Sequence, residues 1–286
     1  MAAMAGILWG ITGVIGQFLF GQKGIEPTWL VSYRLLSAGF TLLLILKCMK
    51  LDIFCVWREK QDAILLCIYS VTGMMMVQFS FFKAVETSNA GTATVLQYLN
   101  PAMMLVFYAL LHRMMPRINE FVVVAMALLG IFLVSTGGDV NNFTLSPAGL
   151  FWGLACAVFT CVYSILPLRL LRKYDARIIC GWGMLLGGIV LTLVTRPWTI
   201  ETNVDQAVVL SMVFLVAFGT IVPFCCSLMA MPIIGPINTN LLSSVEPVVA
   251  AIIAFVVLDT YFSVGEVIGF AFIIGTIFVL AMSKDK

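Results

Sequence analysis

AGTATVLQYLNP at residues 90–101 and PINTNLLSSVEP at residues 236–247 share a pattern, in which small and hydroxyl-bearing residues lead to a polar residue directly before proline. Proline removes a backbone amide donor and disturbs the carbonyl one turn earlier in a helix. Both stretches lie inside long apolar segments, where a freed carbonyl or a polar side chain is tolerated only if it faces protein or water. The recurrence predicts two kinked membrane helices and is the main clue to function.

The composition is that of a polytopic membrane protein. Of 286 residues, 62% are hydrophobic and 10% charged, and the mean hydropathy is +1.08, whereas soluble domains carry roughly 25% charged residues. The net charge of +2 is too small to suggest a nucleic-acid partner. The eight cysteines form no CxxC pair and the single histidine is His112, so we expect no metal site, disulfide framework or cofactor.

A membrane-spanning helix needs about 20 mainly apolar residues, and the chain contains ten such runs. We predict them at 2–21, 28–46, 62–84, 89–111, 118–136, 147–168, 176–195, 206–230, 236–258 and 263–283. The expected fold class is an all-α membrane protein with ten transmembrane helices in a lipid bilayer and no soluble domain.

The basic residues indicate the orientation, because lysine and arginine favour cytoplasmic loops. With both termini in the cytoplasm, three basic residues, Lys23, Lys83 and Arg196, lie outside. Twelve lie inside, namely Lys47, Lys50, Arg58, Lys60, Arg113, Arg117, Arg169, Arg172, Lys173, Arg177, Lys284 and Lys286. This bias also supports the count of ten helices, since dropping one would scramble the alternation.

The chain repeats itself. Gly73, Ala84 and Pro101 recur as Gly219, Ala230 and Pro247 at a constant offset of 146 residues, and GILWG at 6–10 resembles GLFWG at 149–153. We predict two five-helix repeats, residues 1–137 and 147–286. Because five is odd, the second must cross the membrane in the opposite sense, and the loop charges agree. Such inverted repeats can open a central site to either side alternately.

Several of these features form a joint pattern that resembles a known family. Its parts are the WG of the first helix, Arg34, the small residues before Asn100-Pro101, Glu246-Pro247, Gly265-Glu266 and Gly269. Over essentially its whole length the chain is similar to the EamA-type branch of the drug/metabolite transporter superfamily. The resemblance implies a ten-helix bundle in a bacterial cell membrane, with a central cavity that moves small metabolites such as amino acids. Export is the favoured direction.

Polar side chains form one stripe on each proline-containing helix, at a spacing of three or four residues. The two stripes are Ala93, Gln97, Asn100 and Met104, and Thr239, Ser243, Glu246 and Ala250. Repeat symmetry would bring the stripes face to face near mid-membrane. They either line a cavity or make interhelical hydrogen bonds worth on the order of 0.6 to 2 kcal/mol each. We favour the cavity, because two long amides and a carboxyl exceed what helix association requires.

Two charges lie within the spans. An ionised Glu246 at bilayer depth would cost at least about 2.5 kcal/mol, so it should be protonated, paired or hydrated. It is a candidate proton carrier, a counter-ion for a cationic group, or a cap on the kinked backbone. Arg34 is interpreted mainly as snorkelling outward or as part of a structural pair, and alternatively as a counter-charge for a substrate carboxylate. Pro101 and Pro247 are either hinges or static kinks.

Other polar and aromatic residues complete the expected site. Trp9 and Trp152 are repeat mates that either contact substrate or pack, and Gln17 and Gln78 are amides inside spans. The whole predicted substrate-binding set is Trp9, Gln17, Gln78, Gln97, Tyr98, Asn100, Trp152, Tyr163, Thr239, Ser243 and Glu246. Four GxxxG pairs predict close helix approach, at Gly6/Gly10, Gly149/Gly153, Gly183/Gly187 and Gly265/Gly269.

The predicted function is secondary-type transport of a small polar or amphipathic metabolite. There is no GxxxxGK[ST] nucleotide-binding loop. A flippase for a lipid or lipid-linked sugar is the main alternative, because a flippase could use the same arrangement of inverted repeats around a central site. A membrane-embedded lipid-processing enzyme would need histidines or acids converging at one membrane face, which this sequence does not offer. The oligomeric state does not follow from the sequence.

Overall fold

The structure, a computed structural model, describes residues 1–100, 102–104, 118–138 and 145–283, and this part is helical without strands. Helices lie in all ten predicted runs. They are α1 (Ala2–Lys23), α2 (Pro27–Cys48), α3 (Lys60–Tyr69), α4 (Met76–Thr87), α5 (Ala90–Gln97), α7 (Ile118–Thr136), α8 (Pro147–Ile165), α9 (Leu168–Leu171), α10 (Ala176–Thr195), α11 (Gln206–Val216), α12 (Val222–Ile234), α13 (Pro236–Ser243), α14 (Val245–Leu258) and α15 (Val264–Ser283). Pro101, His112, Arg113, Arg117, Lys284 and Lys286 lie outside the described residues.

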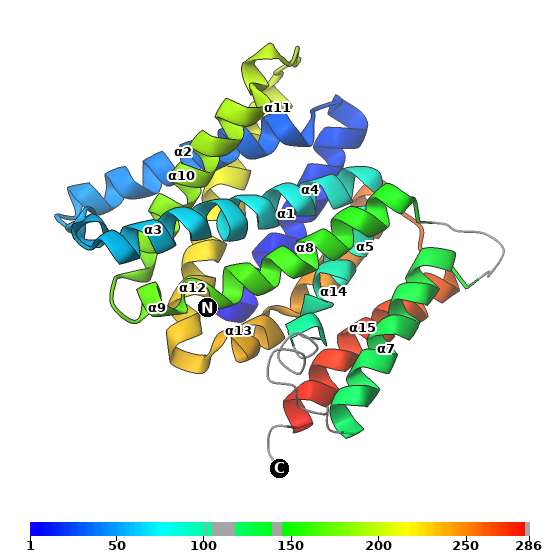
Figure 1. Ribbon diagram of the computed structural model, residues 1–286. Coiled ribbons are helices and arrows are strands. Elements are labelled where there is room, and N and C mark those ends of the chain that lie inside the picture. Colours follow the sequence, from blue (N-terminus) through cyan, green and yellow to red (C-terminus); the bar gives the residue numbers. More distant parts are fainter. Residues whose placement is uncertain (101, 105–117, 139–144, 284–286) are drawn as a thin grey trace.

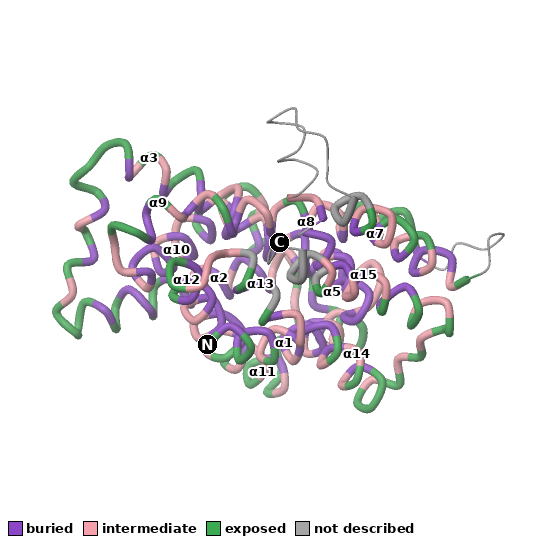
Figure 2. The backbone as a smooth tube through the Cα atoms, turned by 90° about the horizontal axis from the view of Figure 1, so that it is seen from below, coloured by how far each residue is buried: buried purple, intermediate pink, exposed green. Residues whose placement is uncertain are grey.

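The described residues form seven spans that are long and apolar enough to cross a membrane. Some of these spans join two of the helices named above, as Lys60–Thr87 joins α3 and α4. Val122–Thr136 and Val264–Thr276 are shorter apolar stretches. Large apolar side chains also point away from the bundle, as at Phe40, Leu193 and Val256, and Figure 2 shows the buried residues gathered along its interior. An outer surface of this kind suits contact with lipid.

Local sequence sets several helix starts. Asn89, Ser146 and Asp205 each accept a hydrogen bond from a backbone amide in the first turn of the following helix, which satisfies an otherwise unpaired donor. Ser263 and Glu266 cap α15 reciprocally, since each side chain accepts from the other's backbone amide; this is a capping box. Side chains close to the start of each of these four helices therefore satisfy backbone amides of its first turn.

The helices pack in pairs that match the repeat. The predicted mates lie against each other, α2 with α10 and α7 with α15 (Figure 1). Other contacts come as equivalent couples, α4 with α8 and α1 with α12, then α1 with α14 and α5 with α8. Two copies of one five-helix unit would make contacts of this kind.

Two short π-helical turns interrupt the third and eighth spans. They are η2 (Ser70–Met75), between α3 and α4, and η4 (Ala217–Ile221), between α11 and α12. Each contains one of the repeated glycines, Gly73 or Gly219. A π turn inserts an extra residue and releases regular α-helical hydrogen bonds, often near functional sites. The repeat therefore extends to a local backbone irregularity that periodicity did not predict.

Candidate functional site

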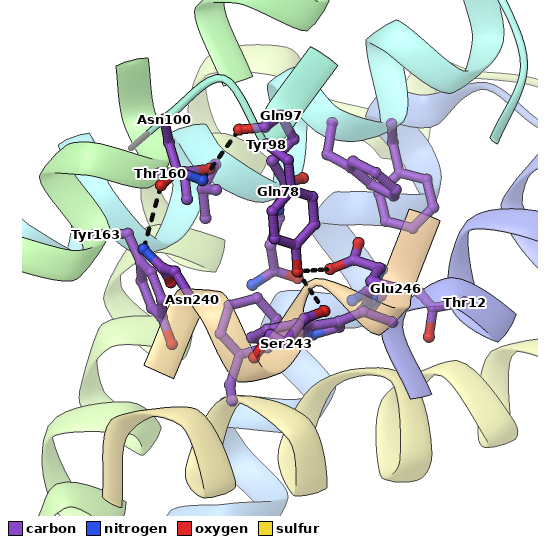
Figure 3. A pocket seen from close by; sticks show the side chains of 16 residues that line it. Thr12, Gln78, Gln97, Tyr98, Asn100, Thr160, Tyr163, Asn240, Ser243 and Glu246 are labelled. Carbon is purple, nitrogen blue, oxygen red and sulfur yellow. Dashed lines mark hydrogen bonds between the residues drawn. The ribbon is translucent and has the colours of Figure 1, made fainter. Parts of the chain in front are cut away.

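A cavity lies where the two proline-containing stretches meet (Figure 3). Its volume of about 50 Å³ has room for a few water molecules. Side chains from α1, α2, α4, α5, α8, α12, α13 and α14 and from the residues after α5 line it. They are Trp9, Thr12, Arg34, Val77, Gln78, Phe81, Phe82, Gln97, Tyr98, Asn100, Thr160, Tyr163, Phe224, Asn240, Ser243 and Glu246.

The backbone breaks at equivalent places on two sides of this cavity. Helix α5 ends at Gln97 and is followed by a turn at Tyr98, while α13 and α14 are separated at Ser244, which lies 146 residues later. Pro247 lies in the first turn of α14, where a missing amide costs little. In the described residues the α-helices are therefore interrupted by short turns that begin three residues before position 101 and three residues before Pro247.

The carbonyls released by these breaks accept side-chain hydrogen bonds. Ser243 O, one turn before Pro247, accepts from Tyr98 Oη at 2.5 Å. Gln97 O, at the equivalent position before residue 101, accepts from Asn100 Nδ2 at 3.0 Å. Protein side chains therefore satisfy both backbone groups, as the low-dielectric interior requires.

Glu246 lies on the cavity wall, 1% exposed. Its Oε2 atom is 3.1 Å from Tyr98 Oη, which is also 2.5 Å from Ser243 O. A phenol has one proton, so it serves one acceptor at a time. When the phenol donates to Ser243 O, the contact with Glu246 is a hydrogen bond only if the carboxyl is protonated and donates to the phenol oxygen. The geometry thus couples the protonation of Glu246 to the broken backbone of α13 and α14.

Arg34 is buried, which corrects the expectation that it snorkels outward. Its side chain is 1% exposed, because η4 supplies acceptors deep in the bundle. Nε donates to Thr220 Oγ1, and Nη2 donates to Gly219 O at 3.0 Å. The guanidinium also lies 4.8 Å from the centre of the Phe82 ring, within the range of a cation–π contact. No described acid pairs with Arg34, so the structural pair expected for it is also absent from this part of the chain.

An amide network crosses the cavity. Asn240 Nδ2, on α13, donates to Asn100 Oδ1 at 3.2 Å and contacts Ser164 Oγ on α8 at 3.3 Å. Aromatic rings form the apolar wall, with Phe224 edge-on to both Trp9 and Tyr163 at centroid distances of 5.0 and 5.5 Å. The chamber therefore combines polar and aromatic surfaces, which suits an amphipathic small molecule.

Most of the predicted site residues meet at this cavity, but three do not line it. Gln17 bridges Thr260 Oγ1 and the Ala90 amide at the start of α5. Trp152 packs edge-on to Phe79, and Thr239 donates to Gly235 O, directly before its own helix. Sequence reasoning missed Thr12, Val77, Thr160, Asn240 and the phenylalanines. Of these, Asn240 carried a usable signal, because it lies one residue from the polar stripe of its helix.

Ion pairs join the ends of spans at two equivalent places. Lys23, at the end of α1, pairs with Asp205 before α11 at 2.5 Å. At the equivalent place, Lys173 pairs with Glu59 and, at 2.8 Å, with Asp62, which also lies 3.2 Å from Arg169. The Lys23 ammonium lowers the pKa of Asp205, and hydrogen bonds to Asp62 and Glu59 raise the pKa of Lys173. Glu59 and Arg169 are the 146-residue mates of Asp205 and Lys23.

The sequence pattern of the EamA-like transporter family matches residues 1–136 and again residues 147–282. The chain belongs to this family. Membership confirms the predicted family and the all-helical, two-repeat membrane fold. Within the described residues, no group of three or more His, Cys, Asp or Glu side chains could hold a metal ion.

Two relatives are named as transporters. The uncharacterized inner membrane transporter YicL of Salmonella typhimurium (strain LT2) is 32% identical over 283 residues, which cover 99% of this chain and 94% of YicL. The uncharacterized transporter YdfC of Bacillus subtilis (strain 168) is 25% identical over 246 residues, covering 82% and 75% of the two chains. A solved structure described only as "Crystal structure of protein" has a TM-score of 0.65 and 19% identity, covering 97% of this EamA-like chain and 96% of its own. The last comparison shows the fold alone.

Proposed function

We propose that this EamA-like protein is a secondary-type transporter, not an enzyme, that moves an amino acid or a related amphipathic metabolite, with export as the favoured direction. The proposal rests on one observation: interrupted helices from both halves meet at a cavity with polar and aromatic walls (Figure 3). Discontinuous helices at mid-membrane are typical of substrate sites in secondary transporters.

We further propose that residues 1–137 and 147–286 are inverted repeats, with both termini in the cytoplasm of a bacterial cell. One predicted span precedes Lys23 and six precede Lys173, so the two ion-pair groups would lie on opposite membrane faces. Both groups are formed here, around a cavity of about 50 Å³. This volume is too small for a metabolite, so the walls must separate. If one ion-pair group broke while the other remained formed, the cavity would open to one side of the membrane at a time, which is alternating access.

Four irregular backbone sites would allow that motion. They are the turn at Tyr98, the break at Ser244 and the π turns η2 and η4. Hinges are commonly a few residues at element ends that absorb large backbone changes. We propose these sites as the flexing points, with Pro247 keeping the second break open.

The test is counterflow. Proteoliposomes containing the purified protein are loaded in turn with each of the twenty unlabelled amino acids and then given the same radiolabelled compound outside. A transporter with alternating access accumulates label transiently, whereas empty liposomes do not. If the inserted protein moves none of the twenty, the amino-acid assignment fails, and nucleobases and sugars are tried next.

Glu246→Gln is expected to abolish any pH dependence of this counterflow. Glutamine keeps the size and hydrogen-bonding capacity of the side chain but cannot exchange a proton. The rate is measured from pH 5 to pH 9 with equal pH on both sides, and then with a pH gradient. Glu201→Gln, at an exposed loop residue, is the matched control and should retain the wild-type profile. An unchanged profile in Glu246→Gln would remove Glu246 as a proton carrier.

A further inference from the structure

We propose that the cavity, once its walls separate, binds a zwitterion, with Arg34 holding the substrate's carboxylate and Glu246 facing its ammonium group. This inference rests on the proposed transport function and deepens it, because it assigns the chemistry of the substrate's two polar ends. It also makes Arg34 a specificity-determining residue.

The guanidinium of Arg34 is held in place and still has an unused hydrogen-bond donor. The π turn η4 holds two of its three guanidinium nitrogens, Nε on Thr220 Oγ1 and Nη2 on Gly219 O. The third, Nη1, is buried and has no hydrogen-bond partner among the described residues. Buried polar groups are nearly always hydrogen-bonded. Arg34 lines the cavity, so an anionic group bound there would complete its hydrogen bonding.

Arg34 and Glu246 are charged residues without ion-pair partners among the described residues. A buried cation is normally paired with an anion, yet no ion pair involves Arg34 in the part of the chain that the structure covers. Glu246 lines the same cavity and likewise has no described basic partner. One acid and one base thus share a chamber without pairing with each other. A ligand with both charges is complementary to that arrangement.

Neutral groups on the wall fit the same ligand. Trp9 Nε1 is a buried donor, and Gln78 Oε1 a buried acceptor, without a hydrogen-bond partner among the described residues; both residues line the cavity. Phe81 and Phe224 supply an apolar surface beside them. The carboxylate of a zwitterion could thus accept a hydrogen bond from Trp9, and its ammonium could donate one to Gln78. An apolar side chain of the ligand would contact the phenylalanine rings.

Binding is tested separately from transport. Thermal unfolding of the purified protein in detergent is followed with each of the twenty amino acids. The most stabilising one is then compared with its amide, which lacks the carboxylate, and with its hydroxy acid, which lacks the ammonium. The proteins compared are wild type, Arg34→Gln, Thr220→Val and Glu246→Gln. Arg58→Gln, at an exposed residue between α2 and α3, is the control.

We expect wild type and Arg58→Gln to bind the amino acid at least about tenfold more tightly than its amide, because hydrogen bonds between charged groups are the strong ones. Arg34→Gln should lose this preference. Thr220→Val, which retains the charge but frees Nε, should weaken binding severalfold and still reject the amide. Glu246→Gln should lose the preference for the amino acid over the hydroxy acid.

Equal binding of the amino acid and its amide by wild type would overturn the assignment, as would an Arg34→Gln variant that still prefers the amino acid. If Arg34→Gln does not fold, the comparison of ligands in wild type and Thr220→Val decides. Amino acids that stabilise the protein but show no counterflow would refute transport and leave the assignment standing. Equal counterflow of the amino acid and its amide would support transport and refute the zwitterion assignment. A protein that binds none of the twenty amino acids would also refute the assignment.

Discussion

Gly6→Ala is expected to lower the free energy of unfolding by about 1–3 kcal/mol, the usual cost of overpacking. A Cβ atom at Gly6 would lie 2.4 Å from the carbonyl oxygen of Ser243, on the backbone at the break between α13 and α14. Backbone atoms cannot rotate away as a side-chain end can, so α1 must move off the broken helix. Because this contact adjoins the cavity, counterflow should fall as well.

The same helix offers a control. Nothing lies within 4 Å of a Cβ at Gly21, so Gly21→Ala should be neutral or slightly stabilising, since alanine favours helix by up to about 1 kcal/mol over glycine. Unfolding temperatures in detergent compare the two variants. If both unfold at the wild-type temperature, α1 does not pack on the break as closely as described.

Tyr98→Phe is expected to cost about 1–2 kcal/mol of stability and to reduce counterflow strongly. The ring and its packing remain, while the donor at 2.5 Å from Ser243 O and 3.1 Å from Glu246 Oε2 is lost. Both partners are buried, and an unsatisfied buried acceptor bears its desolvation cost. The α13–α14 break would then lose a tie to the first half of the chain.

Tyr261→Phe removes the same hydroxyl from a side chain that is 78% exposed and should change neither property. Unfolding temperature and initial counterflow rate are compared at one pH. Wild-type values in Tyr98→Phe would mean that the hydroxyl does not link the two halves functionally.

Sequence reasoning placed the large features well. The ten apolar runs, the close approach at Gly6 and the released carbonyl of Ser243 follow from chemistry local to one helix. Asn100, Gln97 and Glu246 were predicted to share a cavity, and in the structure all three line the same cavity. Periodicity and a repeat offset were sufficient, because helical geometry fixes which residues share a face.

Features that depend on a second helix were harder to predict. Arg34 was expected mainly to snorkel or to form a structural pair, because its span shows only its depth and not the acceptors on η4 that hold it inside. The π turns leave no mark on apolar periodicity beyond Gly73 and Gly219. Gln17 looks like a site residue in its own span, but its amide caps α5 and contacts Thr260. Such roles depend on packing between segments far apart in the chain.

We propose that one cavity between the two halves opens to each side of the membrane in turn. Thr160→Cys places a thiol on the cavity wall once the eight native cysteines are replaced. A membrane-impermeant thiol reagent is then applied to right-side-out and to inside-out vesicles. We predict labelling from both sides, slowed on both by a transported amino acid. Labelling from one side only, under every condition, would contradict alternating access.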